Sequence, residues 1–131
     1  MTIEKTKKKH LSDLHFEHKL WSMETAFYAD ELNIYQQWLE EIAAKNTGEE
    51  VVKQVEHFQN QFIIQRNQLE LLNHQIKTHE QWLANQAENH PVAIEHQSFA
   101  DHTLMREQAE TFKALYANLK RDFKEFVGEW M

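Results

Sequence analysis

Histidine is the residue type through which this chain could do chemistry, because nine of its 131 residues are histidines and none is a cysteine. Neutral imidazoles bind transition metals, and in helical bundles they can project inward from facing helices together with carboxylates. The lack of cysteine excludes a disulfide framework, a thiolate zinc site and a thiol nucleophile. The first question is whether any of the histidines lie on a helix face that packs against another helix.

Three long stretches each carry one apolar stripe, with its members alternately three and four residues apart. This spacing is typical of the a/d seam of helices that pack in a coiled coil. The most regular stretch, from Val51 to Leu83, contains neither glycine nor proline. Most seam positions are apolar, but His18, His79 and His102 occupy one position on each stretch. The histidines of interest are therefore expected in the interior.

Helix boundaries follow from the few residues that interrupt these stretches. Asn46 and Gly48 suit a helix end, Thr47 with Glu50 can form a capping box, and Pro91 disfavours helical geometry at the preceding residue. The fold class predicted is all-α, a long antiparallel three-helix coiled-coil bundle in a single domain, 1–131. The expected segments are a basic N-terminal arm over 1–9 and helices over about 10–45, 48–89 and 98–130. A second capping box at Ser98 and Asp101 is possible within the irregular segment 89–101, which could fold over the end of the bundle.

Composition limits the partners. A formal net charge of −7 disfavours nonspecific binding to nucleic acid, which depends on concentrated lysine and arginine. The first residues contain a basic run but no apolar core of a signal peptide, and no segment approaches eighteen uninterrupted apolar residues. We therefore expect a cytoplasmic protein that binds neither nucleic acid nor membrane.

Helix register decides whether the seam histidines meet. If the first two helices pair directly outward from the connection between them, His18 lies opposite Ile76 and His79 lies opposite Leu14. The third helix then brings His102 to the same end. The three histidines are thus predicted within about three successive layers at one end of the bundle.

The sequence does not favour a metal site there. Carboxylate-bridged di-metal bundles use Glu-x-x-His pairs, and the chain contains neither such a pair nor an HExxH motif. The favoured interpretation is that these are neutral histidines near the end of the bundle, with hydrogen bonds to water, to each other or to the loop. No cofactor is predicted, and His18, His79 and His102 remain candidate ligands only, with Glu17 or Glu95 nearby.

No catalytic constellation can be identified either. A nucleophile with a base in reach, a glycine-rich phosphate loop and paired carboxylates in a concave site are all missing from the pattern. The polar seam residue Gln65 is expected opposite Tyr28, where a hydrogen bond between the two would satisfy both and fix the register. The sequence predicts that the protein is not an enzyme.

A second apolar row on the first helix is not explained by the seam. At 100° per residue its mean direction lies about 160° from that of the seam, so the row should face solvent. Its members are Phe16, Leu20, Met23, Phe27 and Ile34. A contiguous apolar patch usually marks an interaction surface, which predicts a homodimer or a helical protein partner. The alternative is that the first helix is wrapped more deeply, or that segment 89–101 covers part of the row.

The segment 55-VEHFQNQFIIQR-66, together with the three-helix layout, resembles a family of small uncharacterised bacterial cytoplasmic proteins. The resemblance implies the three-helix fold but no activity, cofactor or site residue. A hemerythrin-like or ferritin-like assignment is disfavoured by the missing Glu-x-x-His pairs and by the missing fourth helix. The favoured function is a non-catalytic interaction or scaffold module that self-associates through its first helix. The alternative is a metal-binding bundle that uses the seam histidines.

Overall fold

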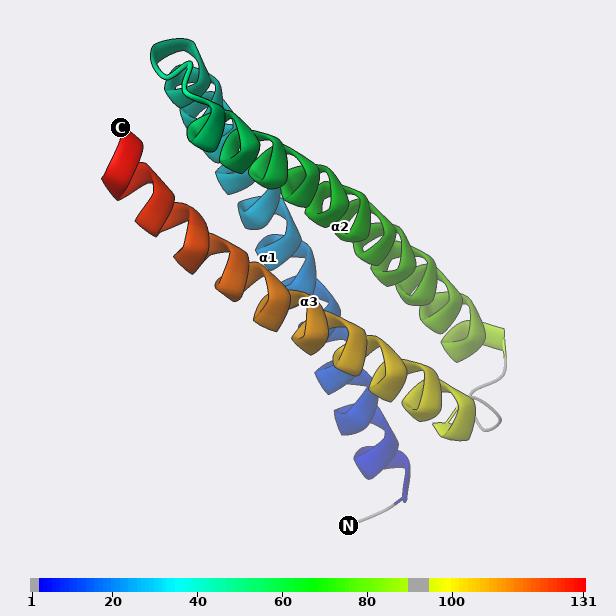
Figure 1. Ribbon diagram of the computed structural model, residues 1–131. Coiled ribbons are helices and arrows are strands. Elements are labelled where there is room, and N and C mark those ends of the chain that lie inside the picture. The colour runs from blue at the N-terminus through cyan, green and yellow to red at the C-terminus, as the bar shows by residue number, and fades with distance from the viewer. Residues whose placement is uncertain (1–2, 90–94) are drawn as a thin grey trace.

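The protein is an antiparallel bundle of three long helices, α1 (Ile3–Lys45), α2 (Glu49–Asn89) and α3 (Glu95–Trp130) (Figure 1). The computed structural model describes the backbone of residues 3–89 and 95–131, and the side chains of residues 12–85, 88 and 101–131. Helices account for almost all of the described backbone, and the described residues include no strand. The predicted all-α three-helix class is therefore confirmed.

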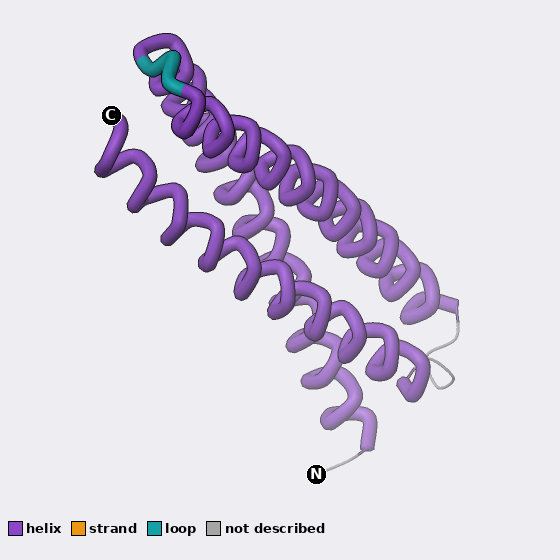
Figure 2. Tube along the Cα trace, in the orientation of Figure 1, coloured by secondary structure: helices purple, strands orange, loops and turns teal. Residues whose placement is uncertain are grey.

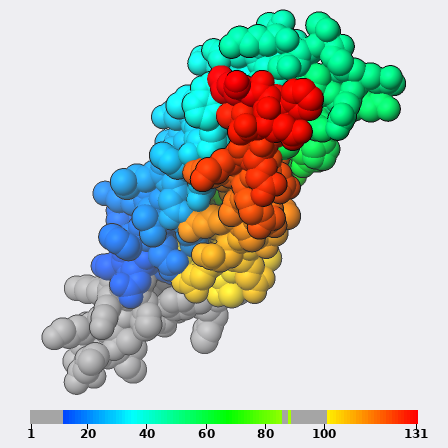
Figure 3. All heavy atoms as spheres, turned by 60° about the vertical axis from the view of Figure 1, so that its left-hand side comes forward, coloured from blue at the N-terminus to red at the C-terminus, as the bar shows by residue number. Residues whose placement is uncertain are grey.

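A short turn of residues 46–48 reverses the chain between α1 and α2 (Figure 2). Asn46 directly follows α1, and both its backbone N–H and its side-chain amide donate to the Ile42 carbonyl, at 3.0 and 2.9 Å. The same side chain also donates to the Trp130 carbonyl at 3.3 Å. This contact ties the last turn of α3 to the α1–α2 turn. Figure 3 shows α3, coloured yellow to red, lying along α1, coloured blue to cyan.

Two of the predicted helix starts are wrong. α1 begins at Ile3, so the expected basic arm is helical from that residue onward, and α3 begins at Glu95 instead of Ser98. Lysine, glutamate and glutamine are strong helix formers, and neither helix start has a glycine or proline to stop it. Ser98 therefore lies inside α3, where it cannot cap the helix. The segment 89–101 was predicted to be irregular, but residue 89 belongs to α2 and residues 95–101 belong to α3, while residues 90–94 lie outside the described residues.

The seams form the core as predicted. Every seam side chain that the structure describes is buried or half-buried, including the polar members His18, Thr25, Gln65, His79 and His102. Burial of each large apolar side chain contributes about 1.5–3 kcal/mol before conformational entropy is subtracted. The seam thus accounts for how the three helices hold together.

The register differs from the prediction by one layer. His18 lies against His79, with Nε2 and Nδ1 2.9 Å apart, and not opposite Ile76 as expected. The expected hydrogen bond between Gln65 and Tyr28 is also absent, and Gln65 Oε1 has no partner among the described residues. A heptad seam packs equally well after a slide of one layer, about 5 Å, so the pattern alone cannot choose between the two pairings.

Candidate metal site in the histidine layer

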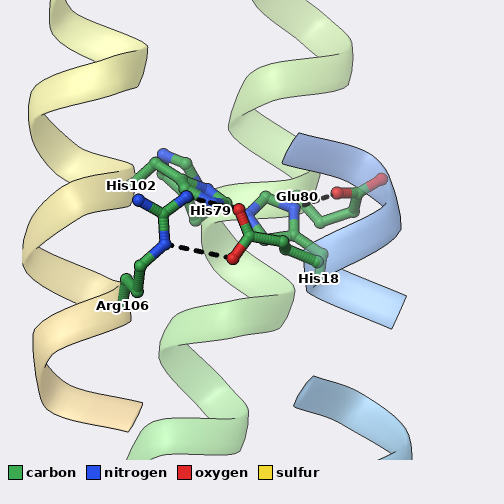
Figure 4. A network of polar contacts seen from close by, with 6 residues as sticks. His18, His79, Glu80, His102 and Arg106 are labelled. Carbon is green, nitrogen blue, oxygen red and sulfur yellow. Dashed lines mark hydrogen bonds and ion pairs between the residues drawn. The ribbon is translucent and has the colours of Figure 1, made fainter. Parts of the chain in front are cut away.

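Three buried histidines, one from each helix, meet in a single layer of the core (Figure 4). His18 of α1, His79 of α2 and His102 of α3 are 2%, 8% and 1% exposed. Their ring centroids are 4.9 to 6.0 Å apart. One nitrogen from each ring can be chosen so that the three lie within 4.8 Å of one another. Imidazole nitrogens this close, from three different helices, form a possible metal-binding set.

Aromatic and aliphatic side chains surround this layer. The Trp21 ring stacks on His102 with centroids 5.0 Å apart, and the Trp82 ring stacks on His79 with centroids 5.8 Å apart. Leu14 and Leu83 pack together as a separate buried pair, with Trp82 half-buried against it. The imidazoles are therefore shielded from water by apolar surface, which strengthens every electrostatic interaction within the layer.

Glu80, the residue after His79 on α2, connects the layer to the surface. One of its carboxylate oxygens accepts a hydrogen bond from Nδ1 of the buried His18, and the other accepts one from Nδ1 of His15. The side chain of His15 is 51% exposed, whereas that of His18 is 2% exposed. Burial acts to raise the pKa of Glu80, but the hydrogen bonds from the two histidines outweigh it and lower that pKa below its usual value.

On the other side of the layer, Glu17 accepts a hydrogen bond from a buried histidine in the same way. Its Oε1 accepts a hydrogen bond from His102 Nε2 at 3.0 Å, and its Oε2 accepts one from Arg106 Nε at 3.1 Å. A second guanidinium nitrogen of Arg106 also donates to Oε1. Arg106 is the main cause of the lowered pKa of Glu17, and Glu17 in turn raises the pKa of Arg106. Glu17 is thus fixed as a carboxylate by a forked pair with arginine.

These hydrogen bonds determine which ring nitrogens carry protons in the neutral imidazoles. In its neutral form His18 donates from Nδ1 to Glu80, so its Nε2 carries a lone pair and accepts a hydrogen bond from His79 Nδ1. His102 donates from Nε2 to Glu17, which leaves Nδ1 as a lone pair. His79 Nε2 and His102 Nδ1 are both buried without a partner among the described residues. Among the described residues, the layer therefore contains two acceptors without a partner.

Both His79 and His102 favour the neutral form. Burial lowers the pKa of His79, and the neighbouring imidazole of His18 lowers it further. Burial also lowers the pKa of His102, although the hydrogen bond to Glu17 opposes the effect in part. Neutral imidazole is the form that binds a metal, because the lone pair is then free.

The structure brings together all three of the predicted candidate ligands, and it places Glu17 beside them as expected. The side chain of Glu95, the other expected neighbour, lies outside the described residues. Glu80, His15 and Arg106 were not predicted as site residues. The signal that could have revealed Glu80 is adjacency, since it follows the seam residue His79 just as Glu17 precedes His18.

The apolar row on α1 faces solvent, as the periodicity predicted. Its five side chains are between 41% and 71% exposed, so α1 is not wrapped more deeply by the described residues. The row consists of Phe16, Leu20, Met23, Phe27 and Ile34. Its orientation is confirmed, whereas the homodimer or helical partner expected to cover it stays a prediction.

A groove between α2 and α3 lacks metal-binding side chains like those of the histidine layer. It has a volume of about 490 Å³ and is lined by aliphatic side chains such as Ile64, Leu71 and Leu104, with Gln65 in its floor. Glu107 is the one ionisable residue among its lining side chains. The groove therefore lacks the converging donors of the histidine layer.

No family model, curated protein or solved structure matches this chain. The resemblance drawn from residues 55–66 consequently stays a prediction. Among the helices of the described residues, none combines the length and the apolar character needed to span a bilayer.

Proposed function

We propose that this bundle binds one divalent transition-metal ion of the zinc class through His18, His79 and His102. The observation that supports the proposal is the pair of buried lone pairs, His79 Nε2 and His102 Nδ1, that no described residue satisfies. An unsatisfied buried acceptor costs about 1–3 kcal/mol. A metal ion would bind several such lone pairs at once, whereas the apolar side chains around them have no group that could do so.

The carboxylates behind the imidazoles support the same function. In metal centres the ring nitrogen that does not bind the ion commonly donates to a carboxylate, which fixes the tautomer and the orientation of the ring. Glu80 stands behind His18 in this way, and Glu17 stands behind His102. Together with Arg106 the two carboxylates carry one net negative charge, which would offset part of the charge of the ion.

The geometry requires a small closure around the ion. Tetrahedral zinc with Zn–N distances of about 2.0–2.1 Å needs ligand nitrogens about 3.3–3.4 Å apart. One nitrogen from each ring lies within 4.8 Å of the other two, so the rings would have to approach one another by up to about 1.4 Å to bind an ion. His79 would exchange its hydrogen bond to His18 for the ion. Three imidazoles leave one tetrahedral position that the described residues do not fill.

The donor set also limits which ions fit. Imidazole nitrogen favours zinc, copper, nickel and iron, whereas calcium and magnesium prefer oxygen ligands. A single water donating to both lone pairs would satisfy the same atoms without a metal. The test must therefore separate a metal ion from a structural water.

Calorimetric titration with Zn²⁺ makes this separation. Protein purified without a histidine tag and stripped with a chelator is expected to bind one ion per chain, and His79→Ala is expected to abolish that binding. His74→Ala is the matched control, because His74 lies on the same helix but is exposed. Equal, weak binding by all three proteins would overturn the proposal in favour of the water.

Self-association through α1 is a second candidate function, and the exposure of its apolar row favours it. The row extends over about 27 Å, at 1.5 Å per residue from Phe16 to Ile34. A second copy could bury this row against its own in a symmetric pair, which would remove both from water. Met23 and Phe16 of this row also line the grooves on either side of the histidine layer, so a partner on the row would lie next to that layer.

Sedimentation equilibrium tests the second candidate. We expect a dimer at tens of micromolar, and a monomer with unchanged helicity after joint substitution of Phe16, Met23 and Phe27 by serine. A matched triple variant at Ile63, Leu71 and Leu104, which are exposed on α2 and α3, should remain dimeric. A monomeric wild-type chain would exclude self-association.

A further inference from the structure

The two sides of the histidine layer differ in how they reach solvent. On the α1–α3 side, the Glu17 carboxylate is held by two donors of Arg106 and by His102. On the α1–α2 side, the partners of the Glu80 carboxylate among the described residues are two imidazoles, one buried and one exposed. An arginine cannot be deprotonated or displaced by a cation without a large cost, whereas imidazole and carboxylate are themselves metal ligands. The α1–α2 side is thus the one at which an incoming ion would meet ligands.

A surface groove leads to this point. It has a volume of about 510 Å³, and its lining includes the exposed His15, the buried His18 and the Glu80 that joins them. His18 is the innermost of these residues, and its Nε2 faces His79. His15 and Glu80 at the surface are therefore linked by hydrogen bonds to His18, whose other ring nitrogen belongs to the proposed metal site.

We infer that His15 and Glu80 form a capture site through which a divalent metal ion passes to the buried histidines. The inference rests on the proposed metal binding. An ion arriving from solvent would first bind the His15 imidazole and the Glu80 oxygen next to it. It would then move to His18 Nε2 as the hydrogen bond between His18 and His79 opens. Glu80 keeps its other oxygen on His18 Nδ1 throughout, so the ring stays oriented.

The charges around the groove would not attract a cation. Capture of the ion would therefore depend on coordination by His15 and Glu80. Lys19 and Lys77 also line the groove, and both would repel a cation. On the opposite side, Asp13 and Glu17 together outweigh Arg106 in charge, so electrostatic attraction alone would favour that side. The two routes therefore make opposite predictions for His15 and Asp13, and substitution of each residue discriminates between them.

The test is stopped-flow quenching of tryptophan fluorescence by Co²⁺ in the full chain. Trp21 and Trp82 stack on His102 and His79, so binding at the buried site should quench their emission. His15→Ala is expected to slow association by about tenfold and dissociation by the same factor. The equilibrium Kd should then stay within about twofold of the wild type, because the residue contacts the ion only in transit.

Asp13→Asn and His74→Ala are the matched controls, and both should leave the rates unchanged. An unchanged rate in His15→Ala, or a slower rate in Asp13→Asn, would overturn the capture site while leaving the buried metal site in place. A weaker Kd with faster dissociation in His15→Ala would also overturn it, since that result identifies a residue that holds the bound ion. A wild-type chain that binds no Co²⁺ would overturn both proposals.

Discussion

The two ends of the bundle fill equivalent seam positions with different chemistry. Near the α1–α2 turn, the rings of Phe58, Phe62, Phe123 and Phe126 pack against one another with centroids 4.9 to 6.3 Å apart. At the other end, His18, His79 and His102 are buried to a similar degree. The four phenylalanine rings carry no polar atom that needs a partner, whereas His79 and His102 each bury an acceptor without a partner among the described residues. Equal burial therefore has different consequences at the two ends, and under the proposed metal binding only the histidine end would gain stability from a cation.

The largest expected effect is at the aromatic end. Phe123→Ala should lower the free energy of unfolding by about 3–5 kcal/mol, because Phe123 is 1% exposed and its removal leaves a cavity among four other aromatic rings. Chemical denaturation followed by circular dichroism measures the change. The loss should be the same with and without Zn²⁺, and a loss that depends on Zn²⁺ would show that the two ends are coupled.

An intermediate effect is expected from Glu80→Gln. The neutral amide orients His18 less strongly than the carboxylate, so the affinity for Zn²⁺ should fall by about 10–100-fold. Competition against a chelator of known affinity measures this change. Glu40→Gln, on an exposed face of α1, serves as the control. Unchanged affinity in Glu80→Gln would show that the carboxylate does not support the site.

The smallest effect is the pH dependence of the metal-free protein. The folded-state pKa values of His79 and His102 lie below the unfolded value of 6.5, so the folded state binds fewer protons than the unfolded state. Their contribution is present in full above about pH 6.5 and is lost as pH falls through the folded-state pKa values. The free energy of unfolding should therefore fall between pH 7 and 5, by at most about 1.4 kcal/mol per pH unit for each histidine.

Denaturation at a series of pH values, with a chelator present, measures this slope. His79→Leu should reduce it by removing one of the two groups, while His74→Ala should leave it unchanged because His74 is exposed. A slope that survives in His79→Leu would assign the pH dependence to other groups. Glu17 and Glu80 act in the same direction only at lower pH, since their folded-state pKa values lie below 4.5.

The sequence determined the three helices, the seam residues that form the core and the outward direction of the row from Phe16 to Ile34. These features are local, because the 3.6-residue period of a helix fixes which side chains share a face. It also placed the three seam histidines at one end of the bundle. The starts of α1 and α3 could not be predicted from the sequence, because no glycine or proline marks them.

Only the tertiary structure decided that the histidines share one layer. A heptad pattern repeats, so neighbouring registers bury the same number of apolar side chains, and the choice between them depends on the turn and on close packing. The slide by one layer separated Gln65 from Tyr28 and set His18 against His79. It also brought Glu80 beside His15 and His18. The ligand set and its carboxylates are consequences of register, which a periodic sequence leaves open.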